Sequence, residues 1–249
     1  MVEYNVKKYA SQIKDHYLLS LVGRLGLNLM ATQNPEALGP RIDIQLSFDR
    51  STHSYSQSEP PQIRLKVTSR AEHAITFFTW REPLDPKGAL TNNGYMITDL
   101  TTGQEVKTTG GIQINRAPLR RVRGDYDERF FLTLEPDTPV ELSTWFGRGN
   151  TKPDLRAIVE RGRERDEHGN ELTARRSTQA TGVDGLEPGH QYSVTLNMEG
   201  LRSCLWAPVS KDEILVDHRG EGSQVYDYAW NREMSPDFHV NSALLNVLE

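Results

Sequence analysis

The chain has 249 residues, of which 36% are hydrophobic and 25% are charged, and its formal net charge is −5. This length is enough for one large domain with a full hydrophobic core, while the polar composition predicts substantial loops around that core. The mild negative charge gives no support to nucleic acid or an acidic membrane as a general partner, so we expect a protein partner.

The cysteine content and the N-terminal sequence bear on the cellular compartment. The chain has a single cysteine, Cys204, and therefore no intrachain disulfide, which favours a reducing, cytoplasmic environment. The most apolar run, residues 17–30, follows three lysines as in a signal peptide, but Arg24 interrupts it and it is too short to span a bilayer. We interpret residues 1–40 as an extension, either an amphipathic helix or disordered, with secretion as the alternative.

Alternation of apolar and polar residues predicts the strands. Residues 42–48 alternate without a fault, and because successive β side chains point to opposite faces, their four apolar side chains share one face. Residues 63–68 and 192–196 alternate in the same way, and the run 74–80 is rich in β-branched and aromatic residues. Further strands are predicted at 95–100, 104–107, 130–134 and 140–146, with a weaker candidate at 213–216. These short strands, without long helical periodicity, indicate an all-β sandwich or barrel.

One turn motif narrows this fold class. The sequence Leu-Glu-Pro-Gly-His-Gln-Tyr at 186–192 resembles the Leu-x-Pro-Gly-x-x-Tyr signature of fibronectin-type and other immunoglobulin-like sandwiches. In those domains a corner tyrosine, here Tyr192, bonds through its hydroxyl to the backbone upstream. An ordinary turn followed by a strand tyrosine is the alternative. We predict an immunoglobulin-like antiparallel β-sandwich over residues 41–217.

Two further segments flank or interrupt this sandwich. Residues 154–176 are dominated by Arg, Glu and Asp, so we interpret residues 148–184 as a charged insertion, either a solvated helix or a loop. Residues 218–249 mix aromatic and polar residues and are expected to be an irregular C-terminal extension. Within it, residues 238–248 are either a last strand or a short helix.

The strand and turn motifs, taken in chain order, carry a family resemblance. They are Ile63–Thr68, Leu84–Leu90, Tyr95–Gly103, Phe130–Pro136 with Val140–Leu142, and Gly189–Tyr192. Over residues 42–196 the chain resembles the N-terminal, non-catalytic β-sandwich of deuterolysin-type fungal zinc metalloproteases, and is more similar still to a group of uncharacterised fungal proteins. The His-Glu-x-x-His motif of the protease domain is absent from the sequence. The resemblance therefore implies the accessory sandwich without the zinc protease domain.

Motifs for catalysis, cofactors and metals are lacking. No two of the seven histidines form the close pair that usually begins a zinc site. A zinc site assembled from distant strands is the alternative. There is no Gly-x-Ser-x-Gly elbow, and Cys204 next to Leu205 and Trp206 is typical of a buried thiol. A cysteine nucleophile would need a histidine nearby in space. We predict no catalytic, cofactor or metal site and no enzymatic activity.

The candidate interaction loop is the densest basic cluster in the chain. It consists of Arg116, Arg120, Arg121 and Arg123. Such a cluster suits phosphate groups or an acidic protein surface. The alternative is that Asp125, Asp127 and Glu128 neutralise it locally and make a salt-bridged loop.

Three hypotheses about function remain. The first is a non-enzymatic binding or scaffold module that contacts a protein through the inserts at 81–93, 110–129 and 147–185. The second is an enzyme or small-ligand binder with a pocket in the sandwich. The third, suggested only by the resemblance, is a protease-associated or inhibitory protein.

Overall fold

The computed structural model of the protein describes residues 39–106, 110–111, 116–147, 176–177 and 182–248. The chain divides into two units, Met1–Ala37 and Leu38–Glu249, and all described residues belong to the second. Residues 1–38 of the predicted N-terminal extension and most of the predicted charged insertion therefore lie outside the described residues.

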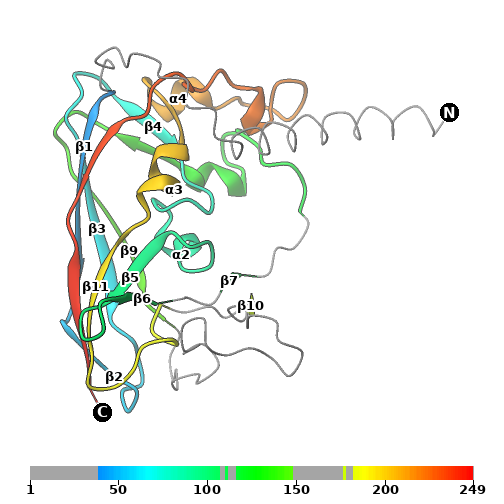
Figure 1. The fold of residues 1–249 in the computed structure, drawn as a ribbon. Coiled ribbons are helices and arrows are strands. Elements are labelled where there is room, and N and C mark those ends of the chain that lie inside the picture. The colour runs from blue at the N-terminus through cyan, green and yellow to red at the C-terminus, as the bar shows by residue number, and fades with distance from the viewer. Residues whose placement is uncertain (1–38, 107–109, 112–115, 148–175, 178–181, 249) are drawn as a thin grey trace, which may run out of the picture. The chain divides into compact units, whose positions relative to one another are not determined.

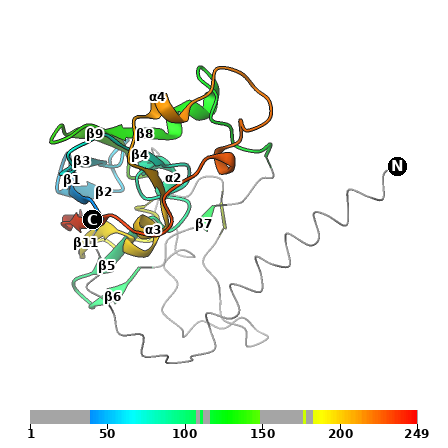
Figure 2. The same cartoon turned by 90° about the horizontal axis from the view of Figure 1, so that it is seen from above.

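Two β-sheets form the sandwich (Figure 1). The first has the order β13-β1-β3-β9, with β1 Arg41–Phe48, β3 Gln62–Ser69, β9 Val140–Trp145 and β13 Asp237–Val240. The second has the order β2-β14-β11-β5-β6, with β2 Thr52–Ser54, β5 Tyr95–Asp99, β6 Gln104–Glu105, β11 Gln191–Leu196 and β14 Ala243–Leu248. The view from above separates the two layers (Figure 2).

The pairing of these strands is that of an immunoglobulin-like sandwich. Strands β1, β3 and β9 pair antiparallel in one sheet, as do β5, β11 and β14 in the other. The predicted fold class is thus confirmed, with one refinement. Strands β13 and β2, at one edge of each sheet, pair in parallel with their neighbours, whereas the prediction was purely antiparallel.

The core lies between the two sheets and follows the predicted alternation. Thirteen inward-facing side chains are each at most 6% exposed: Ile42, Ile44, Leu46, Ile63, Leu65 and Val67 from the first sheet, and Tyr95, Ile97, Tyr192, Val194, Leu196, Leu245 and Val247 from the second. Burial of each such aliphatic side chain stabilises the fold by about 1.5–3 kcal/mol before entropy costs. The intervening Arg64 and Lys66 are exposed on the outer face of β3.

A third sheet carries a second hydrophobic core. Its order is β12-β4-β8, with β4 Ile75–Phe78, β8 Phe131–Leu134 and β12 Leu205–Ala207. Around it lie α4 Lys211–Ile214 and the 3-10 helices η1 Tyr126–Phe130 and η2 Val225–Asp227, and the core includes Phe78, Phe131 and Trp230. The remaining elements are α2 Pro86–Ala89, α3 Met198–Ser203 and the parallel pair β7 Gly110–Gly111 with β10 Arg176–Ser177.

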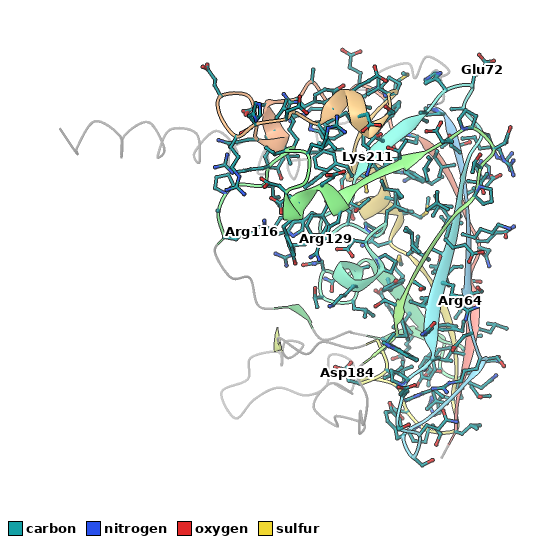
Figure 3. All side chains as sticks on the ribbon, turned by 180° about the vertical axis from the view of Figure 1, so that it is seen from behind. Arg64, Glu72, Arg116, Arg129, Asp184 and Lys211 are labelled. Carbon is teal, nitrogen blue, oxygen red and sulfur yellow. The ribbon has the colours of Figure 1, made fainter. Side chains whose placement is uncertain are left out.

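The first and third sheets are joined by one bent ribbon of two antiparallel strands. Strand β3 pairs with β9, and their continuations β4 and β8 pair with each other. The two paths cross the bend side by side, because the Asp137 amide donates to the Ser69 carbonyl oxygen at 2.9 Å. Arg70 fastens the bend through ion pairs with Asp137 and Asp43 at 2.7 and 2.8 Å. Figure 3 shows β8 and β9 leaving this bend in different directions.

Three segments differ from the sequence-based predictions. The weak strand at 213–216 was wrong, because residues 211–214 form α4, in which the Glu213 carboxylate accepts from the Ser210 amide as in a capping box. The sandwich does not end at residue 217, since residues 237–248 supply β13 and β14, which fits the last-strand alternative. Strand β2 lies between the predicted strands 42–48 and 63–68, where no strand was predicted.

The predicted tyrosine corner is confirmed. Gly189 has a φ of 82°, which glycine adopts without steric cost, and this turns the chain into β11. The Glu187 amide then donates to the Tyr192 hydroxyl at 2.7 Å, and Tyr192 is 1% exposed. A second tyrosine supports the same turn, since the Tyr55 hydroxyl lies 2.5 Å from the carbonyl oxygens of Val183 and Leu186.

Replacing Tyr192→Phe should lower the free energy of unfolding by about 1–3 kcal/mol, because the Glu187 amide loses its acceptor at a buried site. Urea denaturation measures this change. Tyr226→Phe is the matched control, since Tyr226 is 61% exposed and should unfold like the wild type. Equal stability of the Tyr192 variant and the wild type would show that the corner bond does not stabilise the fold.

Candidate functional site

A groove lies between the two arms of the bent ribbon. It has a volume of about 930 Å³ and is walled by η1 and β8 on one arm, by β9 on the other and by the loop around α2. Its aromatic lining is Trp80, Tyr126, Phe130, Phe131 and Trp145. Two of the three predicted surface inserts, 81–93 and 110–129, contribute to these walls, and the described part of the third contributes Gly147.

Strand β9 brings an open sheet edge to this groove. Among the described residues it pairs only with β3, so its other side has no strand neighbour. Leu142 and Thr144 are half-buried and line the groove, whereas Glu141 and Ser143 alternate with them and are exposed. Such an edge presents unpaired backbone groups that accept an added strand.

Arginine side chains cover the aromatic rings at the η1 end of the groove. The guanidinium groups of Arg81 and Arg116 lie over the Trp80 ring, 5.5 and 5.4 Å from its centroid. Arg129 lies 3.7 Å from the centroid of Tyr126 and 4.7 Å from that of Phe130. These are cation–π contacts, and they hold the guanidinium groups in place without neutralising them.

Three basic residues of the groove have no acidic partner among the described residues. Arg81, Lys87 and Arg129 line the groove, and none of them takes part in an ion pair within the described ranges. Arg81 instead donates to the Asn92 side-chain oxygen, and Arg129 to the Tyr126 hydroxyl. With Asp85 as the lining carboxylate, the groove carries three positive charges and one negative charge.

The backbone of Arg81 is strained. Its φ is 65°, in the left-handed region that costs a non-glycine residue about 1–2 kcal/mol. This conformation sets the direction in which the chain leaves Trp80 and enters the groove wall. Strain of this kind is concentrated at binding and catalytic sites.

The four arginines of the predicted basic cluster do not line the groove. Each of them contacts different partners within the fold. Arg116 pairs with Asp127 at 2.6 Å, and Arg123 pairs with Asp212 at 2.6 Å. Arg120 donates to the Ser223 hydroxyl at 3.2 Å. The salt-bridged alternative therefore describes this loop in part, through the pair of Arg116 with Asp127.

The acids that neutralise the loop differ in part from those expected. Asp127 pairs as expected, but Asp125 pairs with Arg219 at 2.8 Å and Glu128 with Lys211 at 3.2 Å. The Arg121 guanidinium donates to the Gly222 and Ile214 carbonyl oxygens and lies over the Tyr228 ring. Arg121 therefore acts as a structural anchor of the second core.

The other candidate groups give no reactive arrangement in the described part of the chain. Cys204 is 4% exposed, and burial, with a smaller contribution from Glu82, raises the pKa of its thiol well above the usual range. His190 pairs with Asp99 at 2.9 Å, but that carboxylate also accepts from Thr101 and Thr102, so the pair belongs to a turn. No three metal-ligating side chains gather among the described residues.

One histidine stands out by its burial. His53 on β2 is 1% exposed, and neither ring nitrogen has a hydrogen-bond partner in the described structure. Its ring packs edge-on against Tyr55, with the centroids 4.7 Å apart. Burial, together with the nearby Arg50, lowers the pKa of His53 to about 4.

Comparison of the chain with protein-family models, with curated proteins and with solved structures finds no match. The resemblance to the deuterolysin N-terminal domain therefore stays a prediction. Within the described residues, no helix has the length and apolar character needed to cross a bilayer.

Replacing Arg121→Ala should lower the free energy of unfolding by about 2 kcal/mol, because two carbonyl oxygens and the Tyr228 ring lose their partner. Chemical denaturation of the variant beside Arg64→Ala, an exposed arginine on β3, measures the difference. If both variants unfolded like the wild type, Arg121 would be available for binding and would not be an anchor.

The burial of His53 predicts a loss of stability on mild acidification. The unfolded state takes up this proton near the ordinary pKa of 6.5 and the folded state only near 4, so stability falls as the pH drops between these values. The full shift corresponds to about 3 kcal/mol. His53→Leu should flatten this part of the stability curve, while His73→Leu, at an exposed position, should leave it unchanged. A slope that survives in His53→Leu would assign it to other groups.

Proposed function

We propose that this protein is a non-enzymatic binding module that holds an extended segment of a protein partner in the groove between β8 and β9. The observation that carries the proposal is the open edge of β9 beside an aromatic groove. An extended chain added to such an edge gains main-chain hydrogen bonds, and the neighbouring hollows receive its alternate side chains. The groove's aromatic and arginine lining has the composition typical of protein interfaces.

The packing of the sandwich supports this proposal over a pocket inside it. Buried aliphatic and aromatic side chains and Cys204 pack together between the two sheets. A small-ligand site needs converging polar groups in a hollow, and the groove described above lies beside the sandwich core, between β8 and β9. The proposal places the protein in the cytoplasm, because its single cysteine is a buried thiol.

Photo-crosslinking at adjacent positions of β9 tests the proposal. A benzoylphenylalanine at Thr144 replaces a residue that lines the groove, whereas the same group at Ser143 replaces an exposed neighbour that does not line it. We expect the Thr144 position, and not the Ser143 position, to form one covalent adduct with a partner protein in cells.

The captured partner must then bind as a purified protein. Its affinity for the Trp145→Ala variant should be about tenfold or more below its affinity for the wild type. This substitution removes an aromatic side chain that lines the groove and is 40% exposed. Isothermal titration calorimetry measures both affinities. Equal adducts at positions 143 and 144, or a purified partner that does not bind, would contradict the proposed function.

A further inference from the structure

We infer that the segment held in the groove is acidic, with carboxylates that pair with Arg81, Lys87 and Arg129. The inference rests on the proposed function and adds the chemistry of the partner to it. Its basis is the contrast between these three cations, which lack an acidic partner among the described residues, and the arginines of the 116–123 loop, which are used within the fold.

The charges of the groove favour carboxylates. Guanidinium groups bind carboxylates with two parallel hydrogen bonds, and such charge-assisted bonds are about twice as strong as neutral ones. The rings of Trp80 and Tyr126 hold the guanidinium groups of Arg81 and Arg129 in position, which reduces the entropy lost on binding. Lys87, which is exposed at the α2 side, adds a third positive charge to the same groove.

The same contacts disfavour a nucleic acid strand. Single-stranded nucleic acid binds by stacking its bases on free aromatic faces, at about 1–3 kcal/mol per base. Here the rings of Trp80, Tyr126 and Phe130 are already in contact with guanidinium groups. The net charge of −5 also opposes a polyanion, whereas a short acidic segment meets only the local positive charge.

Strand β9 determines how an acidic segment would lie. In a strand added along the β9 edge, every second side chain points to the same face, roughly 7 Å apart. One set would face the apolar floor that Leu142, Leu132 and Leu90 contribute to the groove. We therefore expect acidic residues to alternate with apolar ones in the bound segment.

The test uses the full chain and a fluorescein-labelled peptide of alternating Glu and Val, followed by fluorescence anisotropy. The matched peptide with Lys in place of Glu and a labelled oligothymidylate are the two comparison probes. We expect the Glu-Val peptide to bind in a salt-dependent way and both comparison probes to bind at least tenfold more weakly. Tighter binding of the Lys peptide or of the oligothymidylate, or no binding of the Glu-Val peptide, would overturn the inference.

Matched charge variants locate the binding. Arg81→Gln and Arg129→Gln should each weaken binding of the Glu-Val peptide about tenfold, while Arg129→Lys, which keeps the charge but loses the planar two-donor geometry, should have an affinity between those of the wild type and Arg129→Gln. Arg64→Gln makes the same charge change on the outer face of β3, away from Arg129 (Figure 3), and should change the affinity less than twofold. Equal losses in Arg64→Gln and Arg129→Gln would overturn the inference.

Sequencing the segment crosslinked at Thr144 separates the two proposals. A neutral or basic segment there would overturn the acidic ligand and leave the binding function standing. Equal adduct formation at positions 143 and 144 would instead contradict the proposed binding function itself.

Discussion

The bend in the two-stranded ribbon is the constraint on which the candidate site depends. Strands β3 and β9 belong to the sandwich, and their continuations β4 and β8 belong to the third sheet, so the ribbon must change direction between residues 69 and 75 and between residues 134 and 140. The Asp137 amide, the Ser69 carbonyl oxygen and the Arg70 guanidinium hold the two paths together at that point. The groove lies between β8 and β9, beside the edge of β9 that has no strand neighbour among the described residues.

Two sets of basic residues have different surroundings: one set stabilises the fold, and the other is the set that we propose to bind the partner. In the 116–123 loop the guanidinium groups tie chain segments together around the second core through Asp127, Asp212 and backbone carbonyl oxygens. In the groove, Arg81 and Arg129 contact rings and neutral side-chain oxygens and keep their charge available. An uncompensated charge at the surface costs little while water solvates it, and it gains a strong partner when a carboxylate displaces that water.

Much of the sandwich could be predicted from the sequence because strand alternation is a local property. The pattern of residues 42–48 predicted the buried face of β1, and the Pro-Gly turn before Tyr192 predicted the corner bond. Strand β2 escaped prediction because it has only three residues, and α4 escaped because four residues are too few to show helical periodicity.

The candidate site could not be predicted in the same way. The local sequence favoured the arginine-rich loop as the interaction site. The partners of Arg123, however, lie 89 or more residues away in the sequence, so local sequence could not reveal these contacts. Arg81 and Arg129 come from separate segments, and the pairing of β4 with β8 brings them to one groove. The available signals were the aromatic neighbours Trp80 and Phe130, which are also what a hydrophobic core would require.

The most direct test of the account is the NMR spectrum of the four tryptophan indole N–H groups while the acidic Glu-Val peptide is added. Trp80 and Trp145 line the groove, whereas the indoles of Trp206 and Trp230 are buried and donate to the Met234 and Val225 carbonyl oxygens. The account predicts that the signals of Trp80 and Trp145 shift with the added peptide while those of Trp206 and Trp230 stay in place. Shifts confined to Trp206 and Trp230, or no shift at any of the four, would contradict it.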